Sequence, residues 1–174
     1  MTPVNQPVNE EEMLEKLKEV SFFSMFAEND EIMNKIARMC EIRAYRAGSA
    51  IIEEGEYGDE LFIIISGEIN IEKKTMQNER YTVTTLDSSM GGLYVGELAL
   101  IDNDRRSASV MANTDCDCLV IDRDEFLKFG DQNPTAGLSI TRAIASQLAG
   151  KLRKTNEDVI TLFSALVQEI AGNE

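Results

Sequence analysis

Hydrophobic positions near the start of the chain recur every three or four residues, which is the spacing of one helix face. This spacing predicts two amphipathic helices, at 10–19 and 31–40, with Asn29 or Asp30 capping the second. The apolar positions of the two faces are Met13, Leu14, Leu17, Ile32, Met33, Ile36 and Met39. Residues 1–9 are polar and contain Pro3 and Pro7, so we expect a disordered leader there and N-terminal helices over 10–40.

From residue 41 to about residue 121 the pattern changes to short runs of β-branched and aromatic residues separated by glycines and polar bends. Strands are expected at 42–45, 61–65, 69–73, 81–86, 107–112 and 116–121. Short strands with regular turn signals are typical of an antiparallel sandwich or a barrel-like roll. The expected fold class is therefore mainly β with flanking helices, and we assign the roll to residues 41–133.

Helical spacing returns after the last strand. Asp122 can cap a short helix that Gly130 would close, and Asn133-Pro134 can open a long helix to about residue 170, roughly 54 Å in length. Seam positions at steps of three and four are Leu152, Thr155, Val159, Leu162 and Leu166. Such steps are typical of a coiled coil, so residues 134–174 are expected to form a homodimer helix. The alternative is a helix packed against its own sheet.

The last turns of this helix are apolar on more than one face. Its hydrophobic positions are Val159, Ile160, Leu162, Phe163, Leu166, Val167 and Ile170. One coiled-coil seam does not need that many, so a second surface is expected to be buried there. The candidates are the roll, the N-terminal helices and another protein.

Charge and composition exclude several classes of function. The net charge of −14 argues against nucleic acid and against an anionic membrane as partners. The chain has no histidine, which removes the commonest general base and metal ligand. No apolar run is long enough to span a membrane, and an odd number of cysteines fits a reducing compartment, so a cytoplasmic protein is expected. Cys116 and Cys118 fall on one face of a strand, and two buried core thiols are favoured over a redox or metal pair.

Two acidic segments are candidates for other chemistry. The run 53–60 holds five carboxylates, and Asp102, Asn103 and Asp104 follow one another. Calcium would suit such oxygen ligands, but the spacing matches no EF-hand, so we favour a solvated loop and a turn. No nucleophile lies at a recognised spacing from a base. We therefore expect no catalytic residues, no metal and no enzyme activity.

The most informative stretch runs from Gly96 to Val110, here called the cassette loop. Its sequence is GELALIDNDRRSASV. A glycine permits close backbone approach, and the apolar run after it can start a helical turn whose amides point toward an anion. Arg106 returns beside a hydroxyl, and its fork suits a phosphate, while the Glu97 carboxylate accepts hydrogen bonds as a sugar hydroxyl requires. The alternative is a strand–turn–strand with an ordinary ion pair between Glu97 and Arg106.

The cassette loop resembles the phosphate-binding cassette of the cyclic nucleotide-binding domain family, whose pattern is G-E-L-A-L, a variable bend and R-[STA]-A-[ST]-V. The spacing of Gly48, Gly55, Gly58, Asp59 and Gly67 also resembles the first half of that family's β-roll, a jelly-roll of the double-stranded β-helix type. The resemblance implies a protein that binds cAMP or cGMP and needs no other cofactor.

Site residues follow from the resemblance. Arg106 would pair with the exocyclic phosphate oxygens, completed by Ser107 and by backbone amides of the turn after Glu97. Glu97 and the Gly96 backbone would hold the ribose 2′-hydroxyl. The full set carried over by the motif is Gly96, Glu97, Leu98, Ala99, Arg106, Ser107 and Ala108. Arg105 would lie on the other strand face as a surface charge.

Residues 144–157 resemble the dimer helix of the bacterial catabolite activators, whose DNA-binding helix-turn-helix has no counterpart here. There a threonine and the next residue contact adenine, and Thr155 and Asn156 occupy those positions. Base contact and a register-setting polar residue are equal alternatives for Thr155. This helix favours cAMP over cGMP. The expected function is a cyclic nucleotide sensor that repositions helices, and the alternatives are a cGMP sensor or a dimeric docking protein that binds no nucleotide.

Overall fold

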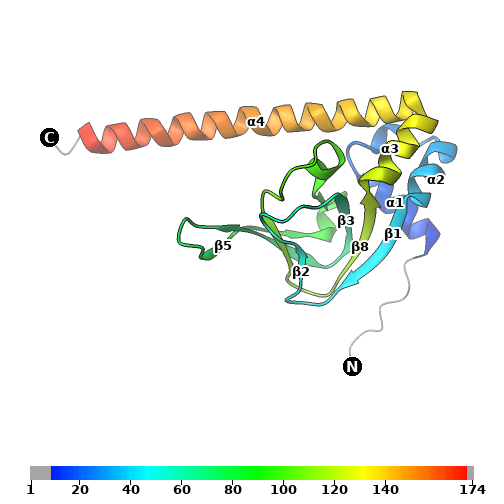
Figure 1. Ribbon diagram of the computed structural model, residues 1–174, viewed down its shortest axis with the longest axis horizontal. Coiled ribbons are helices and arrows are strands. Elements are labelled where there is room, and N and C mark those ends of the chain that lie inside the picture. Colours follow the sequence, from blue (N-terminus) through cyan, green and yellow to red (C-terminus); the bar gives the residue numbers. More distant parts are fainter. Residues whose placement is uncertain (1–8, 172–174) are drawn as a thin grey trace. The chain divides into compact units, whose positions relative to one another are not determined.

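The computed structural model describes residues 9–171. The leader expected at 1–9 lies outside the described residues, except for Asn9, whose side chain accepts a hydrogen bond from the Glu12 amide. The chain divides into two units, Met1–Leu138 and Ser139–Glu174, and each is described by itself. Figure 1 shows the elements of both units in order of sequence.

The first unit begins with the two expected helices. α1 spans Glu10–Glu19, a short 3-10 turn η1 spans Ser24–Phe26, and α2 spans Asp30–Arg38. The Asn29 side chain caps α2 by accepting from the Ile32 amide at 3.1 Å. The second helix ends earlier than expected because Cys40 already pairs with Ile121 in the sheet.

Two four-stranded antiparallel sheets form the roll. The first has the order β1-β8-β3-β6 and the second has the order β2-β7-β4-β5. The strands are β1 (Cys40–Tyr45), β2 (Ala50–Ile52), β3 (Glu60–Ser66), β4 (Glu68–Lys74), β5 (Arg80–Asp87), β6 (Tyr94–Val95), β7 (Ser109–Ala112) and β8 (Cys116–Asp122). Two further 3-10 turns are η2 (Ser88–Met90) and η3 (Glu97–Leu100). The expected fold class, antiparallel sheets with flanking helices, is confirmed.

The core of the roll lies between the two sheets. β3 contributes Phe62 and Ile64, and Val110 of β7 and Ile69 of β4 meet them from the other sheet. Cys116 and Cys118 of β8 belong to the same buried cluster. The expectation that these thiols are core residues is therefore confirmed, and burial raises the pKa of Cys118 to about 12.

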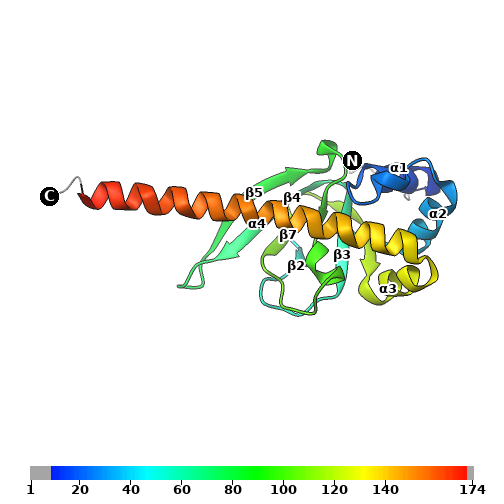
Figure 2. The same ribbon diagram turned by 90° about the horizontal axis from the view of Figure 1, so that it is seen from above.

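The β4–β5 hairpin projects from the rest of the roll (Figures 1 and 2). Its pairing runs from Glu68 opposite Asp87 to Lys74 opposite Arg80, with a register shift after Ile71. The turn at its tip is closed by a hydrogen bond from the Thr75 amide to the Glu79 carbonyl at 2.8 Å. The strand expected at 81–86 is therefore the middle of β5.

Helices close one end of the roll (Figure 2). Phe22, after α1, is fully buried and contacts Tyr94 of β6 edge-on, with 4.8 Å between ring centroids. α3 spans Arg123–Gln132 and is capped by the Asp122 side chain. The expectation that Gly130 ends this helix is wrong. Gly130 lies inside the helix. A Cβ built on Gly137 would lie 2.6 Å from the Gly130 Cα, so the two glycines permit a close approach of the main chain at these positions.

The long helix α4 spans Pro134–Ala171, as expected for a helix from 134 to about 170. From Ser139 onward it forms the second unit. Its side chains from Lys151 to Ala171 are exposed, with Leu162 at 70% and Phe163 at 66%. Within the described residues, no helix combines the length and apolarity needed to cross a membrane.

Candidate functional site

The cassette loop opens with a backbone conformation that only glycine adopts without strain. Gly96 has φ +82°, and a Cβ there would lie 2.9 Å from the Glu60 carbonyl oxygen. The 3-10 turn η3 follows, with the Ala99 amide donating to the Gly96 carbonyl at 3.1 Å. The expected helical turn after the glycine is therefore present, and the Ala99 amide already has this partner.

Arg106 lies directly beside Gly96, as the motif implies. Its guanidinium donates to the Glu60 carbonyl at 2.8 Å through Nη2 and to the Gly96 carbonyl at 3.5 Å through Nη1. The guanidinium carbon lies 5.9 Å from the ring centroid of Phe62. Burial lowers the pKa of Arg106, and the charges of Glu60 and Asp59 oppose that shift. The group stays a cation, and because it is poorly hydrated, an anion that contacts it forms a strong hydrogen-bonded pair.

The acidic run at 53–60, here called the acidic loop, is a scaffold rather than the solvated loop expected from sequence. The Arg106 amide donates to the Glu56 carbonyl at 2.8 Å, and the Arg106 carbonyl accepts from the Gly55 amide at 2.9 Å. Gly58 lies against the guanidinium, where a Cβ would fall 2.5 Å from Nε. The main chain of this loop therefore fixes both the backbone and the side chain of Arg106.

Glu60 links two arginines. Its carbonyl accepts from Arg106, while its carboxylate accepts from Arg43 of β1 at 2.9 and 3.1 Å. Hydrogen bonding to Glu60 raises the pKa of Arg43. The charge of Glu60 is thus engaged by a structural partner, and its main chain serves the cassette loop.

The other motif residues surround Arg106 and Gly96 along the chain. Glu97 begins η3 and is half-buried, Ala99 is buried, and Leu98 is 38% exposed. Ser107 is exposed, and its carbonyl accepts a hydrogen bond from Lys73 of β4, while Ala108 is half-buried. The roles assigned to these residues by the resemblance stay predictions.

Thr155 and Asn156 lie on α4 in the second unit. Both are exposed, and the Thr155 hydroxyl donates to the Lys151 carbonyl one turn earlier at 3.0 Å. Each unit is described by itself, so contact of these residues with a base stays a prediction.

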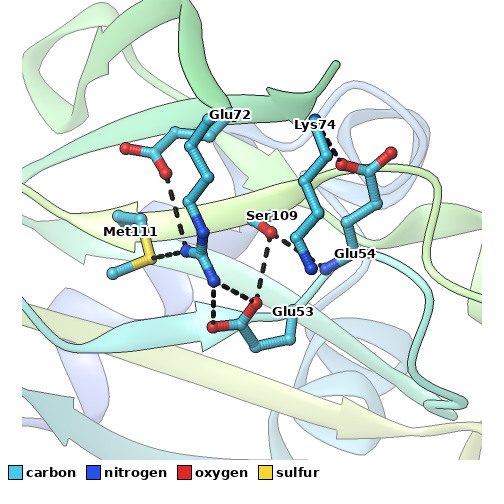
Figure 3. A network of polar contacts seen from close by, with 7 residues as sticks. Glu53, Glu54, Glu72, Lys74, Ser109 and Met111 are labelled. Atoms are coloured by element: carbon cyan, nitrogen blue, oxygen red, sulfur yellow. Dashed lines mark hydrogen bonds and ion pairs between the residues drawn. The ribbon is translucent and has the colours of Figure 1, made fainter. Parts of the chain in front are cut away.

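A polar network links β5, β4 and β7 of the second sheet to Glu53 and Glu54, which directly follow β2 (Figure 3). Arg80 of β5 donates to both carboxylate oxygens of Glu53 at 2.9 and 3.0 Å. The same guanidinium lies 3.7 Å from the Glu72 carboxylate of β4 and 3.6 Å from the Met111 sulfur of β7. Because Ser109 of β7 donates to Glu53 at 3.4 Å, the network reaches the strand that follows the cassette loop.

A second branch of the network holds the start of β7. The Glu54 amide donates to the buried Ser109 hydroxyl at 2.9 Å, and the Glu54 carboxylate accepts from the Lys74 amide at 2.8 Å. Lys73 lies 3.5 Å from the other Glu54 oxygen. β7 begins at Ser109 rather than at the expected residue 107. Before it, Arg105 and Arg106 pair with the acidic loop, and the Ser107 carbonyl accepts from Lys73.

Sequence reasoning missed several residues that build this site. Arg105 is exposed as expected, but it also stacks on Tyr57, with 4.6 Å from its guanidinium carbon to the ring centroid. Gly58, the Glu60 carbonyl and Lys73 were missed as neighbours of the cassette loop. The two glycines of the acidic loop were visible as a signal, because Gly55 and Gly58 precede the apolar run of β3 in a loop rich in carboxylates.

Comparisons with known proteins identify related sequences. The family model described as "Cyclic nucleotide-binding domain" matches residues 42–133. The cGMP-dependent protein kinase, isozyme 1, of Drosophila melanogaster is 36% identical over 99 residues, which are 56% of this chain and 13% of the kinase. The cAMP-dependent protein kinase regulatory subunit of Aspergillus fumigatus is 40% identical over 92 residues, which are 53% of this chain and 21% of that protein. The chain therefore spans a minor part of the length of either relative.

A solved structure shows the same fold. The catabolite activator protein of Thermus thermophilus superposes with a TM-score of 0.68 at 24% identity, covering 79% of this chain and 62% of that one. The family match spans more than half of the chain and includes the loop in which Gly96 and Arg106 meet. This chain belongs to the cyclic nucleotide-binding domain family.

Proposed function

We propose that the chain is a cyclic nucleotide sensor that prefers cAMP. The observation that carries this proposal is the half-buried guanidinium of Arg106, oriented by the carbonyls of Glu60 and Gly96 within an intact cassette sequence. A planar fork of this kind binds a phosphate through two hydrogen bonds. Arg106 would pair with the exocyclic phosphate oxygens of the nucleotide.

The remaining contacts of the nucleotide are assigned by the motif. Glu97 and the Gly96 backbone would hold the ribose 2′-hydroxyl, because an ionised carboxylate only accepts hydrogen bonds. Ser107 and the amides of Leu98 and Ala99 would complete the phosphate contacts, with Ala108 beside them. The Ala99 amide would exchange its bond to the Gly96 carbonyl for one to the phosphate.

The preference for cAMP rests on the activator-like helix. A hydroxyl at Ser107 can meet the amino group of guanine, so that residue is compatible with both nucleotides. The two relatives named above are a cGMP-dependent and a cAMP-dependent protein. Thr155 and Asn156 occupy the positions at which the activators contact adenine, and this supports cAMP.

The output of the sensor would be a change in helix position. Binding would shift an equilibrium between arrangements of the helices. The size of the shift is set by the difference in nucleotide affinity between those arrangements. We include in the proposal a homodimer through α4, a cytoplasmic location, and no enzyme activity, cofactor, nucleic acid or membrane as partner. A phosphodiesterase assay with cAMP and cGMP tests the absence of activity, and turnover above background would contradict it.

A dimeric docking protein is the second candidate. The exposed apolar side chains at the end of α4 favour it, since Ile160 is 65% and Phe163 66% exposed. More apolar surface is exposed there than one coiled-coil seam covers, so a protein partner on this stripe fits either function.

Calorimetric titration with cAMP, cGMP and 5′-AMP tests the sensor proposal. We expect one site per chain, micromolar or tighter binding of cAMP, weaker binding of cGMP, and none of the acyclic control. Arg106→Ala should weaken binding by roughly tens to hundreds of fold, since it removes charge-assisted hydrogen bonds. Arg46→Gln removes one exposed positive charge from the β1–β2 turn and should leave the affinity unchanged. If no nucleotide gives a heat of binding, the sensor proposal is contradicted and the docking protein becomes the favoured function.

A further inference from the structure

Arg105 and Tyr57 form a contact outside the residues that the cassette pattern fixes. The Arg105 guanidinium lies over the Tyr57 ring, 4.6 Å from its centroid, and its Nη1 donates to the Gly55 carbonyl at 2.6 Å. Both side chains are exposed, and Tyr57 is 67% exposed. The contact between the two side chains is therefore made at the surface, outside the core of the roll.

This contact closes a short ladder onto the backbone of Arg106. Tyr57 and Arg105 form an isolated antiparallel bridge. Beside it, the Gly55 amide donates to the Arg106 carbonyl and the Arg106 amide donates to the Glu56 carbonyl. Each of these residues of the acidic loop therefore contacts either Arg105 or Arg106.

The same stretch carries the surface on which the Arg106 side chain rests. Gly58 follows Tyr57 directly, and its Cα lies so close to the Arg106 guanidinium that a Cβ would overlap it. A displacement of Tyr57 would therefore move the backbone partners of Arg106, Gly55 and Glu56, and also Gly58, which lies against the Arg106 guanidinium.

We infer that Arg105 and Tyr57 act together as a latch that positions Arg106. The latch holds residues 55–58 against the cassette loop and thereby fixes the direction of the phosphate-binding fork. Its effect on nucleotide affinity rests on the proposed function, whereas its effect on the position of Arg106 does not. Arg105 and Tyr57 are thus positioning residues, which act on the ligand only through Arg106.

Nuclear magnetic resonance of the full chain without nucleotide tests the positioning directly. Tyr57→Ala should speed hydrogen exchange at the Gly55 and Arg106 amides and shift the Arg106 Nε–H signal. Tyr57→Phe keeps the ring that stacks on the cation and should restore both readouts. Unchanged exchange and an unchanged Nε–H signal in Tyr57→Ala would overturn the latch.

Titration with cAMP then measures the consequence for affinity. Tyr57→Ala should weaken binding about twofold to fivefold, as expected for an exposed cation–π contact. Arg105→Gln should weaken it by about tenfold, because the hydrogen bond to the Gly55 carbonyl is lost as well. The double variant should lose no more than Arg105→Gln alone, since both changes open one latch.

Two controls separate the latch from simple charge attraction. Tyr57→Ala changes no charge, so its effect cannot come from the long-range field, and Arg46→Gln removes a charge without touching the latch. Additive losses in the double variant, or equal losses in Arg105→Gln and Arg46→Gln, would overturn the cooperative role. If the wild-type chain binds no nucleotide, the proposed function fails, and the amide exchange and Nε–H measurements still decide whether the latch positions Arg106.

Discussion

At the scale of single residues, the space beside the Arg106 fork depends on two glycines that differ in kind. Gly96 has a positive φ, so a side chain there strains the backbone as well as colliding with its surroundings. Gly58 has no such backbone requirement, and the three atoms nearest to a Cβ built there all belong to the guanidinium of Arg106. The two positions therefore separate a structural need for glycine from a functional one.

Gly58→Ala should lower nucleotide affinity with little change in the melting temperature. The added Cβ would lie 2.5 Å from Arg106 Nε, so the far end of that side chain must move while the backbone can stay. Calorimetric titration and thermal unfolding measure the two effects. Gly48→Ala is the matched control, because Gly48 has φ +83° and open space around it, and it should lower stability without changing affinity. Equal affinities of Gly58→Ala and wild type would refute this account of the site.

The buried thiols give a pH-dependent prediction. Cys116 and Cys118 are buried, and Cys40 is half-buried. Loss of solvation disfavours the charged thiolate, raises the pKa of Cys118 and of Cys40 to about 12, and also raises that of Cys116. At pH 8 the thiolate fraction of Cys118 is then about a thousandfold below that of an ordinary thiol. Labelling with a disulfide reagent should be slow in the folded chain and keep accelerating above pH 10, whereas the urea-unfolded chain should level off near pH 9 to 10. A rapidly labelled thiol in the folded chain at pH 8 would contradict this.

The candidate site could be predicted from sequence only where its residues lie close together in the chain. Gly96 and Arg106 belong to one continuous motif, and the structure joins them as that motif implies. The acidic loop precedes Arg106 by about fifty residues, and its carboxylates suggested solvation, because nothing local reveals that its carbonyls serve a distant arginine. Stacking of Arg105 on Tyr57 is likewise a product of tertiary pairing.

At the scale of elements, the network around Arg80 makes the projecting hairpin part of the sheet. The guanidinium of Arg80 in β5 contacts Glu72 of β4, Met111 of β7 and Glu53, which directly follows β2 (Figure 3). Hydrogen bonding to Glu53 raises the pKa of Arg80, which therefore stays charged throughout the accessible pH range.

Arg80→Gln should speed amide exchange in β5 and leave exchange in β3 unchanged. It removes the Nη2 group that donates to both Glu53 oxygens and leaves Glu53 and Glu72 without the shared cation. Because Arg80 is exposed, the difference between variant and wild type should shrink in about 1 M salt, where the Debye length is about 3 Å. Arg46→Gln serves as the control. Identical exchange in β5 of variant and wild type would show that the hairpin does not depend on the network.

The longer elements were the most predictable ones. Apolar spacing located α1, α2, α4 and the buried run of β3, because each depends on a periodic burial pattern within a few turns or pleats. The two-residue strand β6 and the turns η1 and η2 gave no pattern, since they exist only through their neighbours. The predicted end of α3 was wrong because Gly130 lies inside the helix and packs against Gly137. A local rule for helix ends does not take such a tertiary contact into account.

At the scale of the whole molecule, the exposed stripe of α4 predicts the oligomeric state. Val159 and Leu166 lie seven residues apart, and both are more than half exposed, at 58% and 53%. Glutamate at both positions should convert a dimer into a monomer in sedimentation experiments, with an unchanged circular dichroism spectrum of the roll. Buried charges facing each other across a seam repel and remain poorly hydrated.

Gln168→Glu provides the matched control for the dimer. At 100° per residue it lies on the face opposite Leu166, so it adds a negative charge without touching the seam. It should sediment as the wild type does. A wild-type chain that is monomeric at all concentrations, or a double variant that remains a dimer, would remove the dimer from the proposal.

The carbonyls that orient Arg106 also bear on how this protein can change over evolutionary time. A main-chain oxygen is present whatever residue occupies the position, so a substitution of Glu60 keeps the carbonyl that holds the Arg106 guanidinium. Arg43 would then lose the carboxylate of Glu60 and keep that of Glu41. Around the proposed phosphate site, the side-chain constraints that this geometry shows fall on Arg106 and on the glycines at 58 and 96. Exposed acidic side chains outside the Arg80 network, such as those of Glu56 and Asp59, are left free to vary, and with them the charge that an approaching nucleotide first encounters.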